Sequence, residues 1–137
     1  GEAKEVAKQH AAIALEQKSQ GKRVMLFSGG ELTVTVADVY GDGGPNQEYL
    51  MALAEALNGE AGIYALACDT DGVDGSKDVA GAYINSTTVT RAQSTGESLQ
   101  AQLEGHNSHQ FFKAIDDLII TGPTNTNVND FRVIVIE

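Results

Sequence analysis

The sequence has 137 residues, the size of one ordinary domain, and carries 19 acidic against 9 basic side chains, a formal net charge of −10. A surface of this sign repels phosphate backbones and anionic headgroups, so neither nucleic acid nor a membrane surface is an expected partner. The single cysteine, Cys68, excludes an internal disulfide and predicts a reducing, cytoplasmic location. We therefore expect one globular domain over residues 1–137.

The first half of the chain alternates helix and strand patterns. Apolar residues at helical spacing predict helices, and short apolar or β-branched runs predict strands. In chain order these are a helix over 2–18, strands over 23–27 and 32–36, a helix over 45–57 and a strand over 63–68. Proline suits the first position of the helix over 45–57, because the N–H that proline lacks would have no partner within the helix.

The second half predicts shorter elements. The segment 79–84 fits either a helix or a strand, and we leave both open. Helices are expected over 88–94, 97–104 and 108–115, and strands over 118–121 and 131–136. Alternating strands and helices indicate an α/β fold, which we expect to be a layered α/β/α domain with a mixed β-sheet.

Four polar loops follow or precede the predicted strands, at 28–31, 41–48, 69–75 and 121–130. Ligand sites of open α/β sheets lie where strand ends meet loops, so these four segments are the candidate site. The glycine loop, Gly41-Asp42-Gly43-Gly44, could bind an anion at the start of the next helix or could be only a tight turn. It matches neither a Walker A loop nor a dinucleotide fingerprint, since Asn46 stands at the third glycine position.

The other two long loops carry different chemistry. Three carboxylates, Asp69, Asp71 and Asp74, fall within six residues and resemble a divalent-cation loop, although an Asp/Gly turn explains the pattern equally well. The segment 121–130 is dense in asparagine and threonine, including Thr121 and Asn127. Such side chains suit the hydroxyl groups of a sugar acid, or hold neighbouring loops in place.

The three histidines and the cysteine give little indication of a metal site or of catalytic residues. His10, His106 and His109 lack metal-ligand spacing and form no recognisable triad with nearby acids. His10 is interpreted as a core or capping residue of the first helix. Cys68 ends an apolar run, so we interpret it as a buried strand residue in preference to a catalytic thiol.

Taken in order and spacing, five motifs resemble the C-terminal domain of the class II glycerate kinases, the MOFRL domain, whose proteins are often labelled hydroxypyruvate reductases. The motifs are SGGELTVTV (28–36), GDGGPNQE (41–48), DTDGVDG (69–75), AGA (80–82) and TGPTNTNVND (121–130). The resemblance runs through essentially the whole chain.

The resemblance implies an ATP-dependent, Mg²⁺-assisted phosphorylation of glycerate in a cleft between two domains. Residues 1–137 would be the C-terminal domain, completed by a Rossmann-like N-terminal domain of the same parent chain; a homodimer is left open. The implied substrate or phosphate contacts are Glu31, Gly43, Gly44, Asn46, Glu48, Thr121 and Asn127, and the implied metal ligands are Asp69, Asp71 and Asp74.

Two positions depart from the family pattern. Leu32 stands where the family usually has threonine, and Pro45 replaces the arginine of its glycine loop. Arginine stabilises charge in phosphoryl transfer and proline cannot, so the catalytic residues stay unassigned. Arg91 and Arg132 are the candidate substitutes. The alternatives are an NAD(P)H-linked hydroxypyruvate reductase and a non-catalytic ligand-binding or structural domain.

Overall fold

The computed structural model describes residues 1–36, 41–75 and 78–137. The elements in chain order are α1 (Ala3–Ser19), β1 (Val24–Gly29), α2 (Pro45–Leu57), β2 (Ile63–Asp69), β3 (Gly81–Ile84), α3 (Thr88–Ser94), α4 (Leu99–Glu104), α5 (Ser108–Ala114), β4 (Leu118–Ile119) and β5 (Asp130–Ile136). The predicted α/β class is confirmed. The segment 79–84, left open between helix and strand, contains strand β3. No helix in the described part of the chain is long and apolar enough to cross a membrane.

The five strands found in the described residues form one sheet in the order β1-β5-β2-β3-β4. Every neighbouring pair is antiparallel, so the prediction of a mixed sheet was wrong. The last strand, β5, inserts between β1 and β2 and pairs with both. Because β1 and β2 both run opposite to β5, their carboxyl ends lie beside the start of β5.

The predicted strand over 32–36 does not form among the described residues. This segment has a β-branched alternating pattern, but its only β-bridge to the described part of the chain joins Glu2 and Thr33. The backbone of Thr33 bonds to Gly1 and Ala3, and the carboxylate of Glu2 accepts the N–H and hydroxyl of Thr35. The N-terminal residues therefore satisfy the polar groups that a sheet neighbour would otherwise satisfy.

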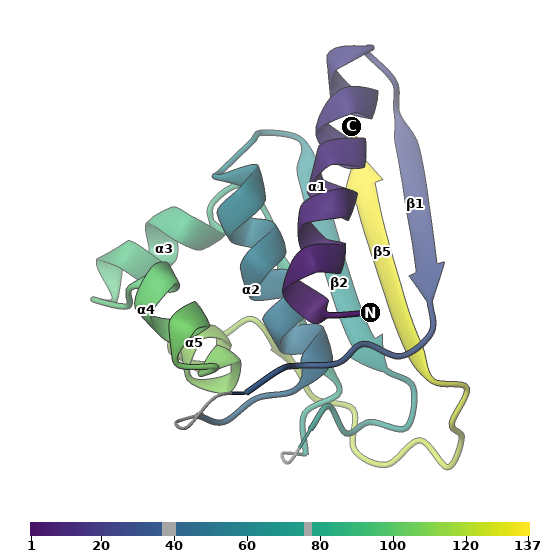
Figure 1. The fold of residues 1–137 in the computed structure, drawn as a ribbon, viewed down its shortest axis with the longest axis vertical. Helices are drawn as coiled ribbons and strands as arrows, with labels where there is room; N and C mark the ends of the chain where they lie inside the picture. Colours follow the sequence, from purple (N-terminus) through teal and green to yellow (C-terminus); the bar gives the residue numbers. More distant parts are fainter. Residues whose placement is uncertain (37–40, 76–77) are drawn as a thin grey trace.

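The helices cover one face of the sheet. Figure 1 shows α1 and α2 side by side in front of the strands, with α3, α4 and α5 grouped beside α2. Small side chains let α1 approach closely, since its buried residues are all alanines: Ala3, Ala7, Ala11 and Ala14. Helix α2 lies at the centre, where its buried positions run from Asn46 to Ala54 and include the large core residues Leu50 and Leu53.

The opposite face of the sheet carries no helical layer among the described residues. Its side chains include exposed apolar residues, namely Met25, Phe27, Tyr64, Tyr83 and Phe131. Phe27 is 66% exposed and contacts Phe131, with ring centroids 6.0 Å apart. The domain is therefore a two-layer α/β structure in its described residues, which corrects the predicted α/β/α arrangement.

Candidate functional site

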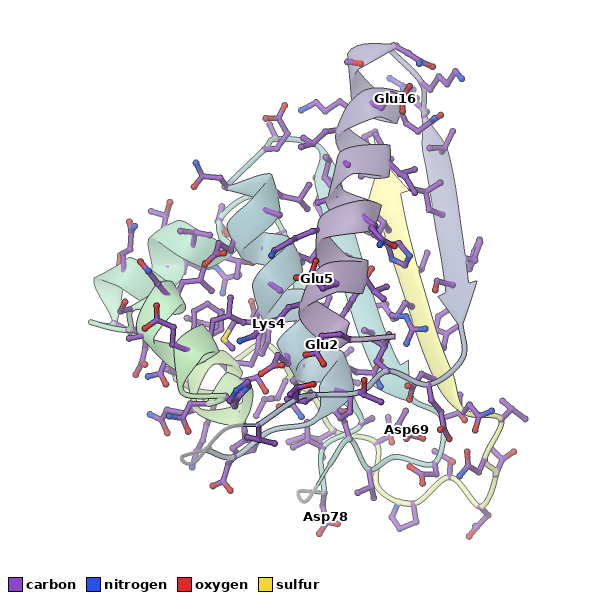
Figure 2. The ribbon with its side chains drawn as sticks, viewed as in Figure 1. Glu2, Lys4, Glu5, Glu16, Asp69 and Asp78 are labelled. Atoms are coloured by element: carbon purple, nitrogen blue, oxygen red, sulfur yellow. The ribbon has the colours of Figure 1, made fainter. Side chains whose placement is uncertain are left out.

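The four polar loops gather at one end of the molecule. Strands β1 and β2 end there, and β5 and α2 begin there, at the lower edge of Figure 1. Register places Gly29 opposite Phe131 and Asp69 opposite Asp130. Figure 2 shows Asp69 and Asp78 at this end and Glu16 at the other. The expectation that these loops lie together is thus met by the sheet topology, and we call this region the loop end.

The start of α2 is held by a buried carboxylate. Asp74 is 1% exposed and accepts the backbone N–H groups of Asn46 (3.1 Å) and Gln47 (2.9 Å), and the side-chain amides of both residues. These backbone groups belong to the first turn and have no intrahelical partner. A phosphate at this helix start would compete with Asp74 for them, so Asp74 acts as the helix cap.

Close packing joins the glycine loop to the segment 69–75. A Cβ on Gly44 would lie 2.4 Å from Cγ of Asp74. A Cβ on Gly75, whose φ is +78°, would lie 2.3 Å from the carbonyl oxygen of Gly43. Glycine is therefore required at both positions, and the two loops form one unit.

Replacing Gly44 with alanine is expected to lower the free energy of unfolding by about 2–3 kcal/mol, because the new methyl group must displace Asp74. Urea unfolding of the domain measures this loss. Gly29→Ala is the matched control, since a Cβ there meets nothing nearer than the Asp130 carbonyl at 3.7 Å. A change for Gly44→Ala as small as that of the control would show that the two loops are not packed as described.

A buried arginine ties β5 to the end of β1. Arg132 is 2% exposed, and its Nη2 donates to the carbonyl oxygens of Gly29 (2.6 Å) and Gly30 (2.8 Å). Its Nη1 lies 3.4 Å from Oδ1 of Asn46 and 3.6 Å from Oδ2 of Asp130. The amide of Asn46 in turn donates to Oδ1 of Asp130 at 2.8 Å. Three loops thus meet through one guanidinium group.

Neither candidate substitute for the loop arginine supplies an uncommitted cation. Arg132 is occupied by the contacts just described. Arg91 lies on α3, where its Nη2 pairs with Asp117 at 2.5 Å and its Nη1 bonds to the Ile115 carbonyl. Pro45 is the first residue of α2, as the sequence predicts.

The carboxylates predicted as metal ligands serve turns and a cap. Asp69 accepts the N–H of Asp71, and Asp71 accepts the N–H of Val73. Asp74 uses both oxygens on Asn46 and Gln47. Among the described residues, no three His, Cys, Asp or Glu side chains are grouped closely enough to hold a metal ion. A cation at these carboxylates would need further oxygen atoms from a bound small molecule, and the binding of a cation stays a prediction.

Asp69 makes the stability of the loop end depend on pH. Burial raises the pKa of Asp69 to about 6, with the carboxylates of Asp71 and Asp130 adding to the rise and the Asp71 N–H opposing it. In the unfolded chain this group titrates near 4. The folded protein thus binds the proton more readily, and the charge of Asp69 costs stability above pH 6 that is recovered as the pH falls towards 4.

Asp69→Asn is therefore expected to stabilise the domain at pH 7, by roughly 1 kcal/mol after screening by solvent, and to have little effect at pH 4. Urea midpoints at the two pH values measure the difference. Asp78→Asn, at an exposed position, controls for the general relief of negative charge. An equal gain at both pH values would contradict the raised pKa.

The asparagine- and threonine-rich loop packs against the segment 69–75. The hydroxyl of Thr70 donates to the carbonyl of Asn129 and accepts the N–H of Val128, and the hydroxyl of Thr124 donates to the carbonyl of Thr70. Asn127 accepts the N–H of Asn129. These contacts agree with the scaffolding interpretation of this loop.

Two predicted contacts lie at the surface of the loop end. The hydroxyl of Thr121 donates to the carbonyl of Gly122, within its own loop. Glu31 is exposed, directly after the Gly30 carbonyl that Arg132 binds.

Glu48 and His106 form a pair that the sequence did not indicate. Nδ1 of His106 lies 2.5 Å from Oε1 of Glu48, whose side chain is 2% exposed. Both residues line a cavity of about 250 Å³ together with Gly43, Gly44 and Ser108. Glu48 lies in the first turn of α2, and His106 lies in the turn between α4 and α5 with a φ of +54°. The two residues are 58 positions apart in the chain, so no local sequence pattern indicates that they pair. Only the structure marks the turn at His106 as unusual, through the positive φ of that residue.

The remaining histidine and cysteine interpretations hold in part. His10 donates to or accepts from Tyr49 at 2.7 Å, which confirms a packing role within the helical layer. Cys68 is half-buried, and burial with the nearby Asp74 charge raises its pKa to about 11. A raised pKa leaves little thiolate at neutral pH, so Cys68 is a poor nucleophile.

The fold and the joined loops define a two-layer α/β domain that carries its four polar loops at one end of an antiparallel sheet. The chain belongs to the MOFRL family, which matches residues 24–130. This confirms the family indicated by the five sequence motifs.

Known relatives and structures agree on this family. A putative hydroxypyruvate reductase of Agrobacterium vitis is 47% identical over 99% of this chain, and glycerate 2-kinase of Pyrococcus horikoshii is 35% identical over 99% of it. A crystal structure of glycerate kinase from Thermotoga maritima superposes with a TM-score of 0.94 at 36% identity, covering 99% of this chain. The chain spans 32% of each of the two relatives and 34% of that crystallised chain, about a third of their length.

Proposed function

We propose that this chain is the C-terminal domain of an ATP-dependent glycerate 2-kinase of the cytoplasm. Its loop end forms one wall of a cleft, and a Rossmann-like N-terminal domain of the same parent chain forms the other. The observation that carries the proposal is the match of 99% of this chain to a third of two glycerate kinases, at 35% and 36% identity. The convergence of all four polar loops at one end supports it.

Within this cleft the described residues have separable tasks. Glu31, Thr121 and Asn127 are exposed at the loop end, where they would contact the substrate or the phosphate transferred to it. Gly43 and Gly44 line the cavity beside Glu48, and their missing side chains make room for Ser108 and Asp74, so their backbone would form a wall of the substrate site. Asn46 is buried and bonded to Asp74 and Asp130, so it maintains the shape of the loop end.

A magnesium ion fits the acidic loop only together with a nucleotide. Asp69 and Asp71 each use one carboxylate oxygen in a turn. Magnesium is typically held by one or two carboxylates plus phosphate oxygens and water, which is the donor set that these two residues would share with ATP. The ion, when bound, neutralises charge on the phosphates. Asp74, capped onto α2, would support this loop from behind.

The proposal is tested with the full-length parent and the isolated domain. Both are incubated with glycerate, ATP and Mg²⁺, and ADP release and the ³¹P spectrum of the product are recorded. We expect the parent to form 2-phosphoglycerate and the domain alone to form none. Equal activity of the isolated domain, or no activity of the parent, would overturn the proposal. Pro45→Arg in the parent is expected to raise turnover, because it supplies a guanidinium beside the cavity.

A second candidate is an NAD(P)H-linked hydroxypyruvate reductase. The name of the Agrobacterium vitis relative, 47% identical to this chain, favours it. The glycine loop lacks the dinucleotide fingerprint, since Asn46 takes the place of its third glycine. Oxidation of NADH by the parent in the presence of hydroxypyruvate, without phosphorylation of glycerate, would favour the reductase over the kinase. Absence of both activities would leave a non-catalytic binding domain.

A further inference from the structure

The pair of His106 and Glu48 has the arrangement of a catalytic base and the residue that orients it. A carboxylate on one nitrogen of an imidazole fixes the tautomer, so that the other nitrogen carries the lone pair. Here Nδ1 lies 2.5 Å from Oε1 of Glu48, which assigns the proton to Nδ1 and leaves Nε2 as the basic nitrogen. The pair lines a cavity at the glycine loop, where the substrate is proposed to lie.

The surroundings of the pair suit a small polar substrate. Val34 and Val36 supply an apolar wall, and Ser108 adds a hydroxyl beside Gly43 and Gly44. The cavity of about 250 Å³ has room for a three-carbon acid but is small for a nucleotide. Its volume therefore favours the hydroxy acid over ATP as the ligand of this cavity.

Two features of the pair exceed what a purely structural hydrogen bond requires. Oε2 of Glu48 is buried and has no hydrogen-bond partner in the described structure, so the carboxylate is incompletely satisfied. His106 adopts a φ of +54°, a conformation that costs a non-glycine residue energy. Backbone strain and under-satisfied buried groups concentrate at functional sites, because elsewhere they would only destabilise the fold.

We propose that His106 is the general base of the phosphoryl transfer and that Glu48 is its positioning residue; this rests on the proposed glycerate 2-kinase function. Nε2 of His106 accepts the proton of the C2 hydroxyl as its oxygen attacks the γ-phosphorus of ATP. A new O–P bond forms, the bond from the γ-phosphorus to the bridging oxygen breaks, and that oxygen leaves with the electron pair on ADP. The imidazolium is stabilised by the Glu48 carboxylate and passes its proton to solvent.

The test compares three variants of the full-length parent with glycerate and Mg-ATP as substrates. His106→Gln is expected to lower kcat by about 100- to 1,000-fold with KM for glycerate within about threefold, because a base acts in the transition state. Glu48→Gln, which keeps the shape but not the charge, is expected to lower kcat by about 10-fold. His10→Gln is the matched control, since His10 also makes one side-chain bond, to Tyr49, but lies in α1 and outside this cavity. Its kcat is expected to stay within about threefold of the wild type.

A readout independent of turnover comes from ¹⁵N spectra of the histidine rings in the same parent. When the His106 ring is neutral, the wild type is expected to carry its proton on Nδ1, and Glu48→Gln is expected to lose this preference. This measurement also detects a variant that has merely misfolded, because the signals of His10 would then shift as well.

The outcomes separate the two proposals. A parent that phosphorylates glycerate while His106→Gln keeps kcat within threefold would overturn the base role alone. So would a neutral His106 ring in the wild type that carries its proton on Nε2 instead of Nδ1. A wild-type parent that phosphorylates no glycerate would overturn the proposed function, and the base role with it, whatever the spectra show.

Discussion

Replacing Arg132 with methionine is expected to lower the free energy of unfolding of this domain by about 3–5 kcal/mol. The guanidinium is 2% exposed and donates to the carbonyls of Gly29 and Gly30. Methionine matches much of its length but provides no donor, so these carbonyls lose a partner and the Asp130 carboxylate, 3.6 Å away, loses its counter-charge. Each buried group left unsatisfied adds its own desolvation cost.

Two further variants isolate the cause of that loss. Arg132→Lys keeps the charge but not the planar fork, and we expect a loss between those of methionine and the wild type. Arg23→Met removes an exposed arginine just before β1 and is expected to change stability by less than about 0.5 kcal/mol. Urea denaturation followed by circular dichroism measures all three. A methionine variant as stable as Arg23→Met would contradict the role of Arg132 in joining the loops.

The sequence predicted the parts of this fold that are set by local signals. Helix α2 runs over Pro45–Leu57, as expected, because Pro45 and the following Asn58-Gly59 mark its two ends chemically. Asn58 adopts the left-handed conformation that such an end requires. The order of strands in the sheet depends instead on which distant segments pair. The insertion of β5 between β1 and β2 makes the sheet antiparallel, and no local pattern reveals that insertion.

The predicted strand at 32–36 shows where local propensity was overruled. Its β-branched residues fit a strand, but Leu32 is buried in the core and Thr33 bonds to the N-terminal residues. Strand propensity contributes only about 1 kcal/mol across its whole scale, which tertiary hydrogen bonds readily outweigh.

The candidate site divides in the same way. The glycines and carboxylates of the loops were identified from composition, because close turns need such residues wherever they lie. The structural tasks of these residues could not be identified from composition, since Asp74 caps the first turn of a helix at residues 27 to 28 positions before it in the chain. The partner of Glu48 lies 58 residues away, on a turn without a recognisable motif. Tasks of this kind depend on the register of distant elements, which the three-dimensional structure supplies.

Asp74 therefore provides the second large test. Asp74→Ala is expected to lower the free energy of unfolding by about 2–4 kcal/mol, because four N–H donors on Asn46 and Gln47 lose their acceptor in a buried position. Burial raises the pKa of Asp74, although these hydrogen bonds oppose the rise. The buried charge therefore costs the folded state some stability, which the alanine variant regains. We expect the loss of the helix cap to outweigh this gain, because several buried N–H donors lose their acceptor while the charge of only one carboxylate is removed.

The matched control for this change is Asp78→Ala, an exposed aspartate of the same loop region, expected to alter stability by less than about 0.5 kcal/mol. Hydrogen exchange separates the loss of the helix cap from a general loss of stability. In Asp74→Ala the amides of Asn46 and Gln47 should lose more protection than the amides of the core, which report the global loss. Unchanged protection of both amides would show that Asp74 does not cap α2. Since Glu48 follows these two residues in the same turn, a frayed helix start would also displace the carboxylate that holds His106.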